Sequence, residues 1–139
     1  MVGNAVLSGA LTPSASEPSA LIRAFPALAA LPRVRCTQLP TAVHRLERLG
    51  AKIGAKDLWI KRDDQSGPLY GGNKPRKLEF LLGDALSRGK RSVMTFGGIG
   101  TNHGLATAIY ARAHDLRTIL VLLGQPATQK VRRNLLLCA

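Results

Sequence analysis

Lys74 stands where a side chain could do covalent chemistry. It lies in the run GGNKPRKLE, residues 71–79, between a glycine pair with Asn73 and a proline that suits the first turn of a helix. A residue before proline favours an extended backbone, so we expect the Lys74 side chain to leave from the helix mouth. There the positive end of the helix dipole should lower the pKa of its amine toward the neutral form that attacks carbonyls. Taken alone, the run also fits a solvated cationic turn or a phosphate cradle.

A second run, GGIGTNHG at residues 97–104, could hold an anion. Its glycines do not fit G-x-G-x-x-G, whose third glycine would fall on His103, and the chain contains no G-x-x-x-x-G-K-[ST], so neither nucleotide motif is present. The run offers a helix N-terminus with free N–H groups, the Thr101 hydroxyl and the Asn102 amide, which together suit a carboxylate or another oxyanion. The alternative is that Thr101 simply caps its helix.

Alternating strands and helices should position these two runs. Residues 1–20 are rich in Ser, Pro and Ala, and we expect them to be a disordered extension. Hydrophobic periodicity and capping residues then predict a helix over 41–50 that ends at Gly50, a strand over 57–64, a helix over 74–88 capped by Asn73, a strand over 92–96, a helix from 105 to about 115, a strand over 118–123 and a helix from 129 capped by Thr128.

This order is typical of the α/β class, with an open, mostly parallel sheet and flanking helices. The apolar run TILVLL, residues 118–123, is of the kind that a parallel sheet buries on both faces. The helix over 74–88 should bury a stripe made of Leu78, Leu81, Leu82, Ala85 and Leu86. Ligands bind such sheets at the carboxyl ends of the strands, where both glycine-rich runs enter helices.

Composition narrows the class of protein. The chain has 139 residues, of which 45% are hydrophobic, so one domain is expected, and it has no apolar run near the roughly 18 residues that span a bilayer. Lys and Arg number 20 against 8 acids, but they are scattered and few aromatics accompany them, so we expect no nucleic-acid partner and no membrane. A non-catalytic basic module that binds an anionic partner is the alternative function.

Cys36 and Cys138 lack CxxC spacing, which favours a reducing, cytoplasmic setting without a disulfide.

Several ordered segments together resemble a known family. These are LPTAVHRLERLG, LWIKRDDQSG, YGGNKPRKLEFLLGDAL, TFGGIGTNHGLATA and VRRNLLL, which run from about residue 39 to 137. The chain closely resembles the pyridoxal-phosphate family of 1-aminocyclopropane-1-carboxylate deaminase and D-cysteine desulfhydrase, which has the tryptophan-synthase-β-like, type II fold. The resemblance implies pyridoxal 5'-phosphate as cofactor, a small amino acid as substrate and a homodimer for a full-length protein.

The resemblance also assigns roles to individual residues. Lys74 would form the Schiff base with the cofactor and then move the substrate α-proton. Asn102 would lie against the cofactor's ring hydroxyl, and Asn73, beside the lysine, is a weaker cofactor-binding candidate. Thr101, Asn102 and His103 would hold the substrate carboxylate. No metal ligands are implied.

Three departures from the family pattern matter. Thr101 replaces the serine whose hydroxyl takes part in opening the cyclopropane ring, and its extra methyl should crowd the site. We therefore expect β-elimination from a D-amino acid rather than cyclopropane-acid deamination. Gly100 replaces a glutamine frequent before that turn. The second half of the family's chain is missing, so we expect residues 21–139 to be the N-terminal part of the enzyme domain and inactive alone; a decayed pseudoenzyme is a further alternative.

Overall fold

The structure is a computed structural model that describes residues 20–138. Apart from Ala20, the expected disordered extension lies outside the described residues. Ala20 begins the short helix α1 (Ala20–Ala24), which a 3-10 helix (Pro26–Ala30) follows. No helix among residues 20–138 is both long and apolar enough to cross a membrane.

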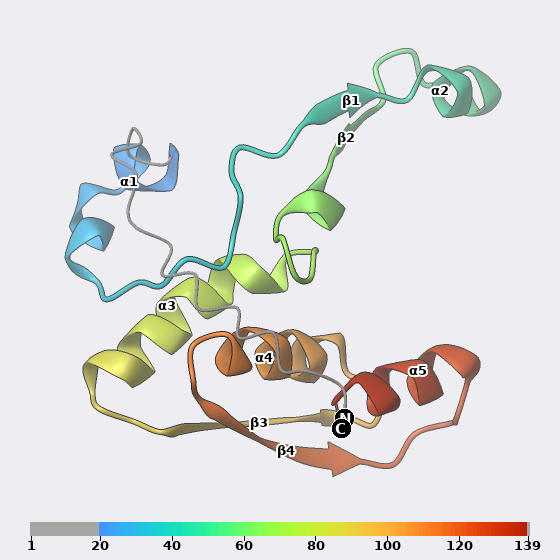
Figure 1. Cartoon of the computed structure of the whole chain (residues 1–139). Helices are drawn as coiled ribbons and strands as arrows, with labels where there is room; N and C mark the ends of the chain where they lie inside the picture. The colour runs from blue at the N-terminus through green and yellow to red at the C-terminus, as the bar shows by residue number, and fades with distance from the viewer. Residues whose placement is uncertain (1–19, 139) are drawn as a thin grey trace, which may run out of the picture.

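A parallel strand pair with helices on one face confirms the α/β class (Figure 1). Strand β3 (Ser92–Gly98) pairs in parallel with β4 (Arg117–Leu123), in a register that runs from Ser92 opposite Arg117 to Gly98 opposite Leu123. Helices α3 (Lys74–Ser87) and α4 (Asn102–Arg112) lie above the pair in this view, and α5 (Gln129–Cys138) packs beside α4. Thr128 caps α5 as predicted, because its hydroxyl accepts from the Val131 N–H at 3.3 Å.

The predicted helix over 41–50 is wrong. That segment forms strand β1 (Val43–Arg45) and then α2 (Glu47–Ile53), and β1 pairs antiparallel with β2 (Trp59–Lys61). Cross-strand hydrogen bonds, such as Leu46 N–H to the Leu58 carbonyl at 2.8 Å, satisfy the backbone in place of helical ones. The helix therefore ends at Gly54, with φ of 73°, rather than at Gly50. The pair forms an arm of its own, so β2 does not join the parallel sheet as expected (Figure 1).

The core lies between α3, α4 and the segment before β1. Its largest members include Leu78 and Leu82 from α3 and Tyr110 from α4, each at most 2% exposed. Two residues of the predicted α3 stripe, Leu81 and Leu86, are instead exposed. Helical phase explains Leu81, which points away from the centre of the side that carries Leu78 and Leu82. Leu86 shares that side but lies in the last turn of the helix.

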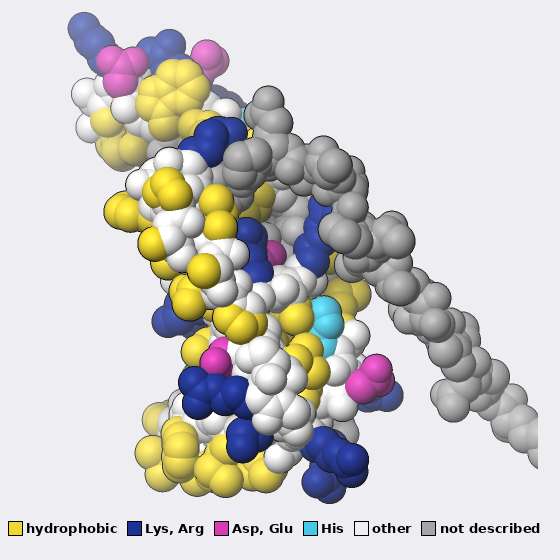
Figure 2. Space-filling model, turned by 90° about the vertical axis from the view of Figure 1, so that its left-hand side faces the viewer, with side chains coloured by type: hydrophobic (Ala, Val, Ile, Leu, Met, Phe, Trp, Pro, Cys, Tyr) yellow, Lys and Arg dark blue, Asp and Glu magenta, His cyan; other side chains and the backbone are white. Residues whose placement is uncertain are grey.

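The parallel pair is buried on one face only, so the expected burial on both faces is wrong. Along β4, exposed and half-buried residues alternate, because α4 covers one face and nothing among the described residues covers the other. Figure 2 shows hydrophobic side chains gathered at the lower end of the molecule, at the level of β3 and β4. The exposed apolar side chains of the two strands are Met94, Phe96, Ile119, Val121 and Leu123. We call these five the bare sheet face.

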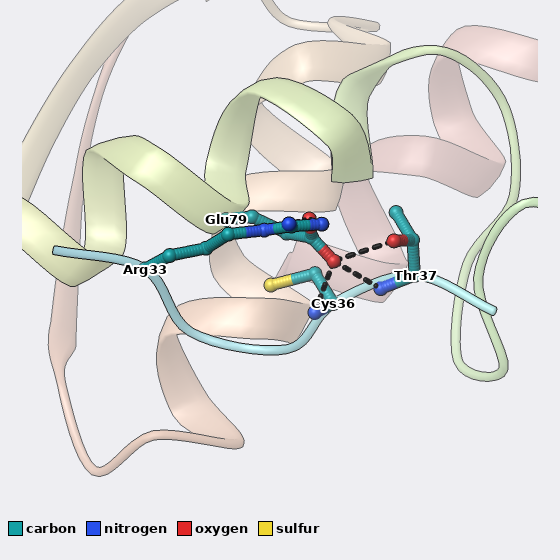
Figure 3. Close-up of polar contacts among 4 residues, drawn as sticks. All are labelled: Arg33, Cys36, Thr37 and Glu79. Carbon is teal, nitrogen blue, oxygen red and sulfur yellow. Dashed lines mark hydrogen bonds and ion pairs between the residues drawn. The ribbon is translucent and has the colours of Figure 1, made fainter. Parts of the chain in front are cut away.

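A buried carboxylate fixes α3 against the chain that precedes β1 (Figure 3). Glu79, 2% exposed, accepts from the backbone N–H groups of Cys36 (3.1 Å) and Thr37 (2.8 Å) and from the Thr37 hydroxyl. Its other oxygen binds the Arg33 guanidinium, with Nε at 2.7 Å. Burial and the nearby Glu79 charge raise the pKa of the Cys36 thiol to about 12, so Cys36 is a core residue rather than a nucleophile. This carboxylate was not foreseen from the sequence.

Candidate active site

Lys74 is the first residue of α3 rather than an extended residue before it. Its Nζ donates to Asn73 Oδ1 at 3.0 Å, and its side chain is half-buried. Asn73 occupies the N-cap position, but its side chain does not cap the helix as predicted. Its backbone is already helical, with φ of −78° and ψ of −12°, whereas a capping residue normally has an extended backbone. The side-chain oxygen of Asn73 therefore accepts a hydrogen bond from the Lys74 amine instead of capping the helix.

Hydrogen bonds join parts of the loop before Lys74 to one another, and an ion pair joins the loop to α3. The Gly72 N–H donates to the Asp63 carbonyl at 2.6 Å, and the buried Ser66 hydroxyl donates to the Gly72 carbonyl. Arg76, two residues beyond the lysine, pairs with the Asp63 carboxylate at 2.7 Å. Gly72 has φ of 95°, a left-handed conformation that glycine adopts without strain. These contacts fix the position from which the Lys74 side chain leaves.

Thr101 caps α4, as the capping interpretation predicted. Its Oγ1 accepts from the Gly104 N–H at 3.1 Å. Its methyl carbon lies 2.4 Å from the point where a Cβ on Gly104 would stand, and that point is 3.4 Å from a methyl of Leu120. The missing side chain of Gly104 therefore makes room for the methyl inside the fold, which argues against the expected crowding of the substrate. The cap takes the Gly104 N–H and leaves those of Asn102 and His103 for a ligand.

Asn102, the exposed first residue of α4, is held through its side-chain oxygen. Asn102 Oδ1 accepts from Nδ2 of the buried Asn134 at 2.9 Å and makes a longer contact, 3.5 Å, with the Tyr70 hydroxyl. Tyr70 is fixed in turn, because the buried Tyr110 hydroxyl donates to the Tyr70 carbonyl at 2.8 Å and accepts from the Tyr70 N–H at 3.2 Å. Tyr70 therefore joins the loop that carries Lys74 to the turn that carries Asn102.

His103 lies near the two lysines of the α3 mouth. Burial lowers the pKa of its imidazole, and the positive charges of Lys77 and Lys74 lower it further. Its Nδ1 is buried and has no hydrogen-bond partner among the described residues. The folded protein thus disfavours the protonated form of the ring, and one ring nitrogen has no partner among the described residues. The structure places the predicted residues in two groups, since Asn73 contacts Lys74, and Thr101, Asn102 and His103 share the start of α4. Tyr70 links the loop of the first group to Asn102 in the second, and the charge of Lys74 acts on His103.

The sequence reasoning missed Tyr70, Tyr110 and Asn134. A weak sequence indication of Asn134 exists, because it stands three residues after Val131 and therefore shares the buried side of α5. No sequence pattern indicates the roles of the two tyrosines. Two hollows in the described part of the chain lie beside residues 35–42 with Gln65 and beside α2, and Lys74 lines neither of them.

The fold and the two joined turns define an α/β protein that carries a lysine amine, an asparagine amide and the start of a helix on two turns linked through Tyr70. The family described as "Pyridoxal-phosphate dependent enzyme" matches residues 34–138. That match covers most of the chain, and the chain belongs to this family. Its fold and its dependence on pyridoxal phosphate are therefore those expected from the sequence.

Individual relatives agree with this assignment. A Pyrococcus horikoshii protein, provisionally named a 1-aminocyclopropane-1-carboxylate deaminase, is 44% identical over 81% of this chain and 34% of its own length. The nocardicin C-9' epimerase of Nocardia uniformis is 39% identical over 81% of this chain and 32% of its own. The bifunctional D-cysteine desulfhydrase/1-aminocyclopropane-1-carboxylate deaminase, mitochondrial, of Arabidopsis thaliana is 45% identical over 60% of this chain and 21% of its own.

A solved structure supports the fold. The crystal structure of an ACC deaminase homologue superposes with a TM-score of 0.67 at 46% identity, and the match covers 73% of this chain and 31% of that one. The chain thus spans about a fifth to a third of the length of these proteins.

The donor set at the two turns fits the cofactor. A primary amine held by one amide oxygen can bond to an aldehyde, and an amide N–H₂ suits a ring hydroxyl. Among the described residues, no hydrogen bond involves Asn102 Nδ2, so this donor is free for a ligand. The unused imidazole nitrogen of His103 is a further polar group beside the amine.

Proposed function

We propose that this chain supplies the lysine-bearing part of a pyridoxal-phosphate enzyme that acts on a small amino acid, by β-elimination of the D-cysteine type or by deamination of 1-aminocyclopropane-1-carboxylate. The observation that supports this most is the joining of the Lys74 loop to the Asn102 turn through Tyr70. Surface cationic turns need no such connection. Family membership supplies the cofactor, and the names of the relatives supply the two candidate substrates.

Lys74 would act twice in this proposal. Its amine would bond to the cofactor carbonyl and later, as a neutral base, take and return a substrate proton. The Asn73 oxygen, 3.0 Å from Nζ, would orient the amine. The cofactor, when bound, supplies the electron sink for the reaction.

The turn at the start of α4 would hold the other reacting groups. Asn102 Nδ2 would donate to the ring oxygen of the cofactor. The N–H groups of Asn102 and His103, with the hydroxyl proton of Thr101, would bind the substrate carboxylate, because the first N–H groups of a helix attract anions. Such binding would fix the α-carbon of the substrate above the ring, where orientation lowers the barrier.

We propose β-elimination from a D-amino acid as the main reaction, because a threonine stands where the resembled family has a ring-opening serine, and the packing of the Thr101 methyl against Gly104 would hold its hydroxyl in the capping position rather than leave it to turn toward a substrate. The test is to compare sulfide release from D-cysteine with keto-acid formation from the cyclopropane acid, in the wild type and in Thr101→Ser. We expect D-cysteine to be preferred by the wild type and the preference to move at least tenfold toward the cyclopropane acid in Thr101→Ser. Equal preferences in the two proteins would exclude this role for Thr101.

The same assays should include a racemisation readout, since one relative carries the name of an epimerase. Loss of the chirality of D-cysteine without sulfide release would overturn β-elimination while leaving the cofactor assignment intact. The variant and the wild type should be made from the whole reading frame that contains this chain.

A further inference from the structure

One side chain in α5 is placed to control the Asn102 amide. Asn134 is 6% exposed, and its Nδ2 donates both to the Gly100 carbonyl and to Asn102 Oδ1, each at 2.9 Å. It is separated from these partners by more than 30 residues of sequence. No role in the proposed function is yet assigned to it.

The chemistry of these contacts fixes which way both amides face. A backbone carbonyl can only accept, so the Asn134 atom opposite Gly100 must be its N–H₂ group. The same N–H₂ group faces Asn102, so the Asn102 atom opposite it must be the oxygen. The Tyr70 hydroxyl also donates to that oxygen, at 3.5 Å. Asn102 therefore has its oxygen engaged by two protein donors and its Nδ2 free.

We propose that Asn134 is a positioning residue, which locks the Asn102 amide so that it offers a donor rather than an acceptor to the bound cofactor. This inference rests on the proposed function. A free asparagine could turn either end to a ligand, and an acceptor facing the ring oxygen of the cofactor would repel it. Asn134 removes that second orientation before any ligand binds, because turning the Asn102 amide would set two N–H₂ groups against each other.

The test is the pH dependence of the visible absorbance of bound pyridoxal phosphate. The absorbance changes when a proton leaves the region between the ring oxygen and the linking nitrogen. A donor on the ring oxygen weakens its hold on that proton and lowers the midpoint of the change. Asn134→Asp can only accept, so it should turn the Asn102 amide over, raise the midpoint by about half a unit to one unit and weaken cofactor binding about two- to tenfold.

Three controls separate positioning from simple loss of structure. Val131→Ala removes packing from the same buried side of α5, including packing next to Gly100, but keeps both hydrogen bonds of Asn134, so it should lower the melting temperature and leave the midpoint unchanged. Asn102→Ala should raise the midpoint like Asn134→Asp. Asn134→Ser is too short to reach Asn102 and adds no charge, so it gives the same test if the aspartate variant does not fold. The titratable and charged neighbours of the site are the same in every variant, so they do not account for a difference in midpoint between the variants. These neighbours are Lys74, Lys77 and His103.

The outcomes distinguish this inference from the function on which it rests. A raised midpoint in Asn134→Asp or Asn134→Ser, with Val131→Ala unchanged, supports the positioning role. A midpoint equal to that of the wild type in the Asn134 variants, or equal shifts in these and in Val131→Ala, overturns it while the proposed function stands. A wild type that takes up no cofactor on Lys74 overturns the proposed function itself.

Discussion

The imidazole of His103 gives the candidate site a testable pH dependence. Burial and the charges of Lys77 and Lys74 disfavour its protonated form in the folded protein, whereas in the unfolded chain it takes up a proton near its ordinary pKa of about 6.5. Below that pH the unfolded state binds more protons than the folded state, so the free energy of unfolding falls as the solution is acidified. The loss ends once the pH drops below the lowered pKa of the folded state.

We predict that His103→Gln removes part of this loss between pH 7.5 and 5.5, measured by urea unfolding at each pH. If wild type and His103→Gln lose the same free energy of unfolding on acidification, His103 does not lie in the environment described.

At the level of single residues, local motifs predicted much of the site and distant contacts did not. Lys74, Thr101 and Asn102 could be found because glycines, a proline and a helix start lie within a few positions of them. Tyr70 and Asn134 could not, because their roles depend on contacts 32 residues away along the chain. The Asn73 cap was wrong for a local reason, since the lysine next to it competes for the same oxygen.

At the level of elements, Glu79 should contribute more to the free energy of unfolding than any exposed charge on α3. It accepts five hydrogen bonds or ion-pair contacts from the segment at residues 33–37 and so holds that segment across the helix whose mouth carries Lys74 (Figure 3). Leaving the buried N–H groups and Arg33 without their acceptor is costly. Gly83, one turn further, has the Pro32 carbonyl 2.5 Å from where its Cβ would stand, which marks the same close crossing.

We predict that Glu79→Ala lowers the free energy of unfolding by about 3 kcal/mol, as measured by denaturant titration. Asp84→Ala is the control on the same helix, because its ion pair with Arg88 is exposed and should contribute at most about 0.5 kcal/mol. Equal losses in the two variants would mean that the buried carboxylate does not hold the segment at residues 33–37 in place.

Elements whose own residues carry a clear apolar period or a capping residue were predicted. Elements that form by pairing with a distant segment were not. The helices α3, α4 and α5 and the strands β3 and β4 follow apolar periodicity and capping residues, so their positions are close to those expected. The segment over 41–50 has leucines at helical spacing, yet Val43 pairs with Lys61, eighteen residues later. Because this pairing depends on a remote strand, local periodicity gave the wrong element.

At the level of the whole molecule, the bare sheet face is an apolar surface that the described residues leave open. Phe96 and Leu123 on it are more than 60% exposed. On the face drawn in Figure 2, Lys and Arg form several separate groups rather than one stripe. Exposed apolar patches of this kind mark surfaces that bind other protein. The sequence could predict neither the extent of the bare sheet face nor that only one face of the strand pair is covered. Which face stays uncovered depends on where α4 packs.

We predict that the 139 residues expressed by themselves bind a fluorescent dye for apolar surface and do not hold pyridoxal phosphate stoichiometrically. The charged variant Phe96→Lys, placed in the centre of the bare sheet face, should reduce the dye signal, whereas Leu136→Lys on exposed α5 should reduce it less. Tight one-to-one cofactor binding by the 139 residues alone would show that this part holds the whole binding site.

Covalent mapping of the cofactor tests the central claim most directly. The protein made from the whole reading frame is loaded with pyridoxal phosphate, reduced with borohydride and digested, and the modified lysine is identified by mass spectrometry. The account predicts one reduced adduct per chain, on Lys74, lost together with the visible absorbance in Lys74→Ala but not in Lys77→Ala. An adduct spread over several surface lysines, or an unchanged absorbance in Lys74→Ala, would contradict it.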